Sequence, residues 1–515
     1  MEKKYFMGID IGTNESKGVL IDGECRIIQT ASASHGLENP KPGYFEHDAE
    51  AVWWGDFCRI SKELIQKSGI AKEEIKGVGA SALSADVVPV DENCRPLRKA
   101  ILYGIDARAV KEMESITEYY GEERTRQLLG HELCSSDCMP KILWIKNNEP
   151  EIYAKTYKFL TASSYLTAKL TDQYVIDRYL AISSFGPCYR QDLSIDEELS
   201  RELYCRGDQL AEGRETAETV GFVTEKAAAE TGLAAGTPVV TGTDDSGAEA
   251  ISTGVLKPGD LMVQIGSTCY IMYCSDRLVE DNRIWSEDFL IPGTFCVDGG
   301  TNAAGSLTKW IRDTMYSDVN EAETGENAYA MMAKKAAGIP AGSDGIMVLP
   351  YFAGERTPIN DSQARGMIFG PLLHHTRDHI NRVALEGVGY SIAQHIDIME
   401  EHGLEIRNFL CAGGGTKNPT WLQIIADITG KTVKTAEVTI GASYGDAMIA
   451  AIGTGHIKDY GDLENYIKSG QTFIPDAETH RVYQPLKKIY GKLYEETKDT
   501  MHMLSERYQG NDFEE

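Results

Sequence analysis

Asp244 and Asp245 are adjacent carboxylic acids near the midpoint of the chain, and their sequence context could place one of them against a ligand. They follow a β-branched run, 239–241, that ends in Gly242, and a small-residue stretch, 246–252, comes after them. This pattern predicts a strand that delivers an acid to the first turn of a tightly packed helix. Such an acid is available for chemistry, or it only caps the helix N-terminus, and this stretch alone leaves both interpretations open.

A second acid ends a short apolar strand near the N-terminus. Residues 5–22 predict two strands joined by a Gly/Thr/Asn/Ser turn, with Asp10 at the end of the first strand and Thr13 in the turn. Backbone N–H groups and the Thr13 hydroxyl in such a turn can face a phosphate, and Asp10 can hold a cation beside it. The alternative is a plain hairpin in which Asp10 only occupies a turn.

The hairpin pattern recurs about half a chain later. Residues 260–274 again place a strand, a Gly-Ser-Thr turn and a second strand, so that Asp10 aligns with Gln264 and Thr13 with Ser267. An internal duplication of a phosphate-binding hairpin is the expected cause. Two facing hairpins would clamp a di- or triphosphate between two domains, although only the first copy carries the acid.

Glycine-rich turns in the second half favour contact with a nucleotide. Residues 408–421 predict a strand, a turn at Gly413 to Gly415 and a helix, which brings backbone close to a ligand at a helix N-terminus. Gly305 opens another predicted helix and permits a similarly close approach. In the first half, Asp106 and Arg108 follow an apolar strand and either line a pocket for hydroxyl groups or form a surface ion pair.

Length and composition narrow the class of protein. A chain of 515 residues predicts two large domains, placed here at 1–250 and 251–515. The net charge of -27 argues against nucleic-acid and anionic membrane partners. Because neither a signal peptide nor a spanning segment is found, the expected compartment is the cytoplasm. The eleven cysteines are expected to be reduced, and Cys134 and Cys138 lack the second ligand pair of a zinc site.

Taken in order, these motifs resemble the FGGY carbohydrate kinases of the actin-like ATPase superfamily. The resemblance covers nearly the whole chain. Residues 141–144 look like the first family signature, with Cys138 departing from it, and residues 366–386 look like the second, with Pro371 and Val383 departing. The resemblance implies an α/β fold of two actin-like (ribonuclease H-like) ATPase domains with an interdomain cleft, and an enzyme that uses ATP and Mg²⁺.

By the same similarity, Asp245 corresponds to the general base, with Asp244 as its neighbour, and Asp10 to the acid that organises magnesium. The positions that correspond to the ATP site comprise the two hairpin turns and the glycine-rich segments. They are Gly12, Thr13, Gly266, Ser267, Thr268, Gly305, Lys309, Gly414, Gly415 and Asn418.

Among the subfamilies, the chain looks most like the xylulokinase branch. Ser84 and Ala85 occupy the place of a Met-His pair that touches the sugar, and residues 103–106 replace a Trp-Asn-Asp segment. Ser84, Ala85, Asp106 and Asp245 are therefore the expected substrate-binding residues. The implied substrate is a small sugar such as D-xylulose. Another ketose, a polyol or a sugar acid is the alternative, and a non-catalytic nucleotide switch or sugar sensor is a third. Oligomeric state stays open, with a homodimer as one option.

Overall fold

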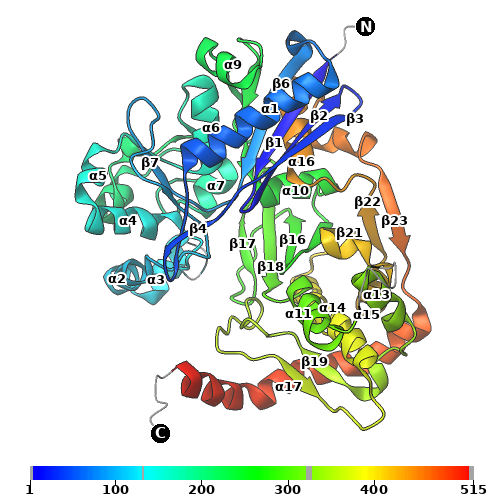
Figure 1. Cartoon of the computed structure of the whole chain (residues 1–515). Helices are drawn as coiled ribbons and strands as arrows, with labels where there is room; N and C mark the ends of the chain where they lie inside the picture. The colour runs from blue at the N-terminus through cyan, green and yellow to red at the C-terminus, as the bar shows by residue number, and fades with distance from the viewer. Residues whose placement is uncertain (1–3, 130, 132, 320–326, 510–515) are drawn as a thin grey trace.

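Two seven-stranded mixed sheets organise the computed structural model, which describes residues 4–129, 131, 133–319 and 327–509 (Figure 1). The first sheet has the order β12-β13-β6-β1-β2-β3, with β14 paired to β6, and the second has the order β17-β18-β16-β15-β21-β22-β23. The strands of the first sheet are β1 (Tyr5–Ile11), β2 (Glu15–Asp22), β3 (Ile27–Ser34), β6 (Ile75–Ala82), β12 (Thr219–Phe222), β13 (Pro238–Val240) and β14 (Thr243–Asp244). Those of the second are β15 (Asp260–Ile265), β16 (Cys269–Ser275), β17 (Trp285–Asp288), β18 (Phe295–Thr301), β21 (Asn408–Ala412), β22 (Val433–Ala436) and β23 (Ser469–Phe473).

The two sheets repeat one pairing scheme. In the first, β1 pairs antiparallel with β2 and parallel with β6, and β6 pairs parallel with β13. In the second, β15 pairs antiparallel with β16 and parallel with β21, and β21 pairs parallel with β22. The edges agree as well, since β13–β12 and β22–β23 are both antiparallel. This correspondence is what the predicted internal duplication requires.

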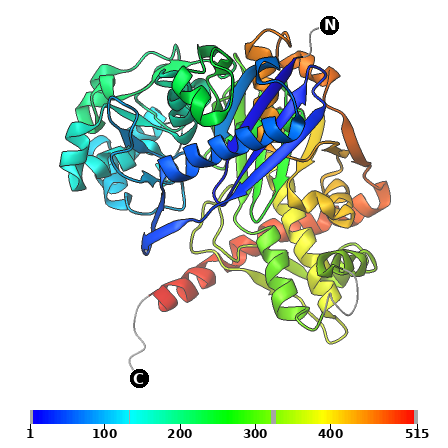
Figure 2. The same ribbon diagram turned by 45° about the horizontal axis from the view of Figure 1, so that its top comes forward.

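Helices cover both faces of the first sheet. α1 (Gly55–Ser68) crosses one face, as Figure 2 shows, and α16 (Ala442–Gly453) packs on β1 and β6. α16 also packs against α10 (Asp245–Thr253), which in turn contacts β21 of the second sheet. The small-residue helices α10 and α16 therefore join the two halves. α16, which belongs to the second half of the chain, covers one face of the first sheet. The division at residue 250 stays a prediction.

The helices of the second half build a separate core on their own sheet. α14 (Arg377–Glu401) packs on α15 (Pro419–Thr429) and β18. Its apolar residues join the core of the second sheet. The remaining helices of this half are α11 (Gly305–Met315), α13 (Ala328–Ala337) and α17 (Ala477–Gln509), and its second small sheet is β19 (Met347–Leu349) with β20 (Met367–Phe369). Short turns of helix lie at η5 (Ser343–Gly345), η6 (Gly414–Lys417) and η7 (Tyr460–Asn465).

An additional region lies beside the first sheet and holds most residues between 84 and 215 (Figure 1). Its helices are α2 (Val110–Tyr120), α3 (Glu122–Leu129), α4 (Cys138–Asn148), α5 (Pro150–Lys155), α6 (Ala162–Thr171), α7 (Arg178–Ser183), α8 (Glu197–Leu199), η3 (Ser200–Tyr204) and η4 (Gly207–Gln209). Its strands are β7 (Val88–Val90), β8 (Ala100–Ile101), β9 (Lys158–Leu160), β10 (Val175–Asp177) and β11 (Glu212–Arg214). Nearby are β4 (Glu38–Lys41), β5 (Tyr44–His47), η1 (Ala49–Trp54), η2 (Lys72–Glu74) and α9 (Glu225–Thr231).

Two further expectations are tested by the described residues. All eleven cysteines are free, as expected for reduced thiols. Within the described ranges, every helix is too short or too polar to cross a lipid bilayer.

Glycines allow α16 to approach the first sheet and α10 at backbone distance. A Cβ added at Gly8 of β1 would lie 2.0 Å from the Ser443 carbonyl oxygen. A Cβ added at Gly445 of α16 would lie 1.9 Å from the Ala248 carbonyl oxygen. Both contacts are with backbone atoms, so neither neighbour can move without shifting a whole element.

Replacing either glycine by alanine is expected to force these elements apart. We predict that Gly8→Ala and Gly445→Ala each lower the free energy of unfolding by about 1–3 kcal/mol, the usual cost of overpacking. Urea unfolding followed by circular dichroism measures the change. Gly36→Ala is the control, since its added Cβ would meet nothing within 4 Å. Wild-type stability in the two packed variants would contradict the close packing.

Candidate active site

Three neighbouring strands of the first sheet bring the predicted acids together at their ends. Asp10 of β1 and Thr243 of β14 both lie in register with Ser81 of β6. One residue further, Asp244 lies in register with Ala82. Ser81 Oγ donates to Asp10 Oδ1 at 3.2 Å. The end of β1 and the start of α10, which are far apart in sequence, therefore lie on either side of one strand.

The two central acids have different surroundings. Asp244 is the N-cap of α10, because one carboxylate oxygen accepts from Gly247 N at 2.7 Å. Its other oxygen accepts from Ser246 Oγ at 2.5 Å and from Ser84 Oγ at 3.1 Å. Asp245 follows as the first residue of the helix and is half-buried. The capping interpretation is thus correct for Asp244, and Asp245 is the acid that remains available for chemistry.

Four carboxylates from three elements form an acidic cluster: Asp10 of β1, Asp245 and Glu249 of α10, and Asp446 of α16. Ser81 Oγ, which donates to Asp10, also lies 2.8 Å from Asp446 Oδ2 and links these two acids. Glu249 Oε2 accepts from Gln264 Nε2 at 2.5 Å. Gln264 is the residue that aligns with Asp10 in the second hairpin, so the two copies meet at this cluster.

The cluster shifts the ionisation of its members. Burial, and then the charge of Glu249, raises the pKa of Asp10 to about 7, although the Ser81 hydroxyl and Lys17 act in the opposite direction. Burial raises the pKa of Asp245 well above its ordinary value, and the charges of Asp10 and Asp244 add to the rise. Burial and Asp10 do the same to the pKa of Asp446. Negative charge is therefore concentrated here beyond what Lys17 offsets.

This donor set fits a divalent cation. Asp446 Oδ1 is buried and has no hydrogen-bond partner among the described residues. A buried carboxylate oxygen in that state needs a proton or a positive charge beside it. Mg²⁺ is held through carboxylate oxygens together with substrate phosphates. Asp10, the predicted magnesium ligand, belongs to this cluster and is linked to Asp446 through Ser81, and its role in holding such an ion stays a prediction.

The first hairpin turn is braced from two sides. His35 Nε2 lies 3.0 Å from the Gly12 carbonyl oxygen, and His35 Nδ1 lies 2.8 Å from Asp56 Oδ2 of α1. Thr13 Oγ1 lies 2.9 Å from the hydroxyl oxygen of Tyr103. Gly12 and Thr13 are therefore held at a defined position next to Asp10.

The second hairpin turn is held by the glycine segments that were predicted to bind ATP. Gly305 N donates to the Gly266 carbonyl oxygen at 2.9 Å, and the Ser267 carbonyl oxygen accepts from Ala304 N at 2.9 Å. Added Cβ atoms at Gly305 and Gly415 would lie 2.4 Å from Gly266 O and from Ile265 Cγ2. Gly266, Ser267 and Thr268 are thus brought together with Gly305 and with the 413–415 turn.

Three other predicted ATP positions have the following surroundings. Gly414 is open, because an added Cβ would meet nothing within 4 Å. Asn418 caps α15 by accepting from Trp421 N at 3.1 Å. Lys309 is exposed and pairs with Asp313 at 2.7 Å on the next turn of α11. A nucleotide-binding role for Lys309 would require its Nζ to leave that pair.

The residues predicted to touch the substrate lie in two segments. Ser84 is bonded to Asp244, and Ala85 beside it is buried. Asp106 is buried as well, with Oδ2 accepting from Phe45 N at 2.6 Å and both oxygens accepting from the Arg108 guanidinium. Asp106 and Arg108 therefore form an ion pair, as one of the two interpretations of the sequence expected. The pair is buried, so the surface location that this interpretation expected is wrong.

A polar group from the second sheet also lies within electrostatic reach of Asp244. Tyr270 donates its hydroxyl to Asp298 Oδ2 at 2.6 Å, and Asp298 Oδ1 is buried without a hydrogen-bond partner among the described residues. Burial raises the pKa of Asp298 to about 6 and that of Glu287 well above its ordinary value, with a smaller contribution from Asp244 in each case. Sequence reasoning did not find these residues.

Other members of the site were also missed. Glu249 lies four residues after Asp245, a spacing that places both on one face of a helix and could have revealed it. Asp446 lies in α16, and only the fold shows that this helix returns to the first sheet. Ser81 had no signal of its own.

A further group of potential metal ligands lies near Cys134. His131, Cys134 and Asp137 offer ligand atoms within 4.8 Å of one another. His131 Nε2 lies 2.9 Å from Asp137 Oδ1, so the histidine and the acid already satisfy each other. Cys138, which was considered alongside Cys134, is buried and donates to the Asp86 carbonyl oxygen.

Comparison with known proteins agrees with this geometry. The family models for the N-terminal and C-terminal domains of the FGGY family of carbohydrate kinases match residues 5–252 and 261–454. The chain belongs to the FGGY family of carbohydrate kinases. Its chemistry is therefore the ATP-dependent phosphorylation of a sugar, as the motifs predicted.

Individual relatives extend over the full chain. A xylulose kinase of Staphylococcus epidermidis is 30% identical over 506 residues, which is 97% of this chain and 98% of the relative. A gluconokinase of Bacillus subtilis is 27% identical and covers 95% of each chain. Among solved structures, xylulose kinase from Rhodospirillum rubrum superposes with a TM-score of 0.88 at 27% identity, covering 97% of this chain and all of that one. The two-domain fold is confirmed.

The different roles of Asp244 and Asp245 can be separated by stability. We predict that Asp244→Ala lowers the free energy of unfolding by about 1 kcal/mol, because it removes the cap of α10. Asp245→Asn should leave stability unchanged or slightly raised, because it removes an acid from a crowded cluster without removing a cap. Thermal unfolding of both variants at one pH makes the comparison. A larger loss in Asp245→Asn than in Asp244→Ala would reverse the assignment.

Proposed function

We propose that this chain transfers the terminal phosphoryl group of ATP to a hydroxyl group of a pentulose, D-xylulose in particular. The observation that carries the proposal is the position of Asp245. It lies on the first turn of α10, where the charge of Asp10 from the first hairpin raises its pKa, and Glu249 on the same helix accepts a hydrogen bond from Gln264 of the second hairpin. This is the arrangement that phosphoryl transfer requires, with a base for the acceptor and fixed groups around the phosphates.

Asp245 serves as the general base in this proposal. Its carboxylate accepts the proton of the attacking hydroxyl group as the oxygen bonds to phosphorus. Mg²⁺, held through Asp10, would supply positive charge to the phosphate oxygens and to the acidic cluster. In the two turns, the backbone N–H groups of Thr13, Ser267 and Thr268 offset charge on the transferring group, since those of Gly12 and Gly266 already donate within their hairpins. Gly414 leaves room for the nucleotide, Gly305 and Gly415 hold their segments against the second turn, and Lys309 and Asn418 lie at the edge of the proposed site.

Ser84, Ala85 and Asp106 form the proposed sugar wall in the first half. Ser84 can exchange its bond with Asp244 for a sugar hydroxyl. Asp106 acts here by fixing Arg108 and the backbone of Phe45, since its oxygens are already engaged. From the second half, Tyr270 and Asp298 supply hydrogen-bonding groups toward the same region.

The charge of this region favours a neutral acceptor. Asp244, Glu287 and Asp298 are acidic groups whose ionisation is already disfavoured, and a sugar acid would place another carboxylate beside them at an electrostatic cost. A ketose or polyol instead donates its hydroxyl groups to such acceptors. This supports D-xylulose over gluconate, although relatives with both substrate names align along most of the chain.

The proposal also includes a cellular compartment and an oligomeric state for the protein. An ATP-dependent metabolic kinase is expected in the cytoplasm, where ATP and free sugars are present. A homodimer is the assembly proposed, and light scattering of the purified full chain tests it.

The catalytic assignment is tested by turnover. We predict that Asp245→Asn lowers kcat for sugar-dependent ADP release at least 100-fold, in line with the usual contribution of a general base. The exposed acid Asp276, changed to Asn, is the matched control and should retain wild-type activity. A near wild-type rate for Asp245→Asn would remove this residue from the role.

The acceptor is tested with a panel of pentuloses, hexuloses, polyols and sugar acids in the presence of ATP and Mg²⁺. We predict that kcat/KM is at least tenfold higher with D-xylulose than with gluconate, because of the charge argument above. Preference for gluconate would contradict the proposed sugar wall while keeping the kinase chemistry. ATP hydrolysis that no sugar stimulates would contradict the proposed function itself.

A further inference from the structure

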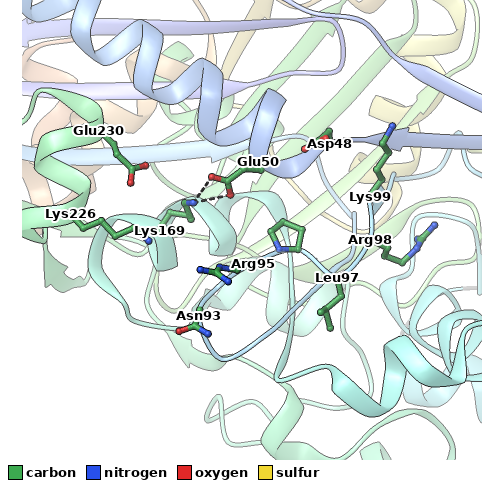
Figure 3. A pocket seen from close by; sticks show the side chains of 11 residues that line it. Asp48, Glu50, Asn93, Arg95, Leu97, Arg98, Lys99, Lys169, Lys226 and Glu230 are labelled. Atoms are coloured by element: carbon green, nitrogen blue, oxygen red, sulfur yellow. Dashed lines mark hydrogen bonds and ion pairs between the residues drawn. The ribbon is translucent and has the colours of Figure 1, made fainter.

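A cavity of about 620 Å³ lies outside the proposed active site, in the first half of the chain. Figure 3 shows it between the loop that joins β7 to β8, helix α6, helix α9 and η1. None of its lining residues belongs to the hairpin turns, to the acidic cluster or to the proposed sugar wall. The residues are Asp48, Glu50, Asn93, Arg95, Pro96, Leu97, Arg98, Lys99, Lys169, Lys226 and Glu230.

The lining is rich in positive charge although the protein is strongly acidic. Five of its residues are Lys or Arg and three are Asp or Glu, whereas the chain as a whole has 51 basic and 78 acidic residues. A local reversal of charge in a concave site concentrates anions there. A ligand can use only those charges that the protein does not already pair.

The carboxylates of the cavity are already engaged by the protein. Glu50 pairs with Lys169 at 2.8 Å and also accepts from the Tyr165 hydroxyl at 2.6 Å. Glu230 accepts from Trp54 Nε1 at 2.6 Å. Asp48 caps η1 by accepting from Ala51 N. These contacts orient the acids toward protein donors, so they repel an incoming anion less than free carboxylates would.

Two of the basic residues are also engaged elsewhere. Arg98 pairs with Glu46 at 2.6 Å and with Glu149 at 2.9 Å, and Lys99 pairs with Glu38 at 2.5 Å. In Figure 3 their side chains extend toward the opposite end of the cavity from Lys169. Arg98 and Lys99 therefore do not supply its free charge.

The remaining cations come from three separate elements and face the same part of the cavity. Arg95 lies in the β7–β8 loop, Lys169 on α6 and Lys226 on α9, and Figure 3 shows them at the end that also contains Asn93. Arg95 and Lys226 are exposed, and within the described part of the chain neither side chain has a hydrogen-bond or ion-pair partner. Lys169 is fixed by Glu50 and by the ring of Trp54, whose centroid lies 5.1 Å from its Nζ.

We propose that this cavity binds a small phosphorylated metabolite, with its phosphoryl group held by Arg95 and Lys226 beside the fixed Lys169. The Arg95 guanidinium and the Lys226 ammonium can offset the charge of a phosphate dianion, and Lys169, whose own charge is paired with Glu50, adds a hydrogen-bond donor beside them. Asn93 offers an amide to the remainder of the ligand. The volume lies in the range of small-molecule sites, and it exceeds what a lone inorganic ion needs. A phosphate ester is therefore the expected occupant.

The experiment must separate this cavity from the ATP site, which also binds phosphates. The full-length protein is first saturated with Mg²⁺ and a non-hydrolysable ATP analogue. Inorganic phosphate and D-xylulose 5-phosphate are then titrated separately by calorimetry at constant ionic strength. We expect saturable binding of both probes, with the ester binding at least fivefold more tightly. Equal affinities would still support the phosphoryl site but assign it to free phosphate.

Charge-reversal variants of the lining residues test whether the two probes bind in this cavity. The double variant with Arg95→Glu and Lys226→Glu should bind both probes at least tenfold more weakly. The exposed Lys72, changed to Glu, is the matched control on the same half of the chain and should change affinity less than twofold. Circular dichroism and binding of the ATP analogue confirm that each variant is folded. Unchanged affinity in the double variant, or no saturable binding by wild type, would overturn the proposal. Neither outcome depends on whether D-xylulose is the acceptor.

Discussion

Electrostatic crowding among buried carboxylates is the constraint on which the site depends. Asp10, Asp245, Glu249 and Asp446 converge from β1, α10 and α16. The charge of Asp10 disfavours ionisation of Asp245 and Asp446, and that of Glu249 disfavours ionisation of Asp10 and Asp245. A fold does not gain stability from such an arrangement, since buried like charges are costly. The cluster is understandable if its charge is balanced when substrates bind. In the proposed function, the acidic cluster and the two hairpins act together, and a bound cation and phosphates would balance the charge.

Close backbone packing makes this crowding attainable. Gly8 and Gly445 let α16 lie directly on β1 and α10, and this contact carries Asp446 to the end of β1. In the second half, Gly305 and Gly415 bring two further segments against the second hairpin turn. Side chains larger than hydrogen at these positions would separate the elements by an ångström or more. The glycines therefore serve the site as much as the fold, because they set the distance between its charged groups.

Local patterns predicted these elements correctly and singled out several of the acids that the fold brings together. The strand–turn–strand repeats, the helix after Asp245 and the glycine turn at 413–415 are all set by residues adjacent in sequence, and all are present. The two acids at 244 and 245 could not be told apart, because capping depends on which carboxylate reaches Gly247 N. Asp446 and Ser81 could not be predicted from the sequence, since only contacts between distant segments bring them to Asp10. The burial of Asp106 with Arg108 likewise depends on segments distant in sequence.

In the proposed function, the acceptor hydroxyl group contacts Asp245 while the terminal phosphate of ATP lies between the two hairpin turns. The most direct measurement is a crystal structure with Mg²⁺, a non-hydrolysable ATP analogue and D-xylulose. We expect a sugar hydroxyl oxygen about 2.6–3.2 Å from the Asp245 carboxylate. The terminal phosphate should lie between the first turn, at Gly12 and Thr13, and the second turn, at residues 266–268. A sugar bound with Asp245 directed away from every hydroxyl, or a phosphate held outside both turns, would contradict it.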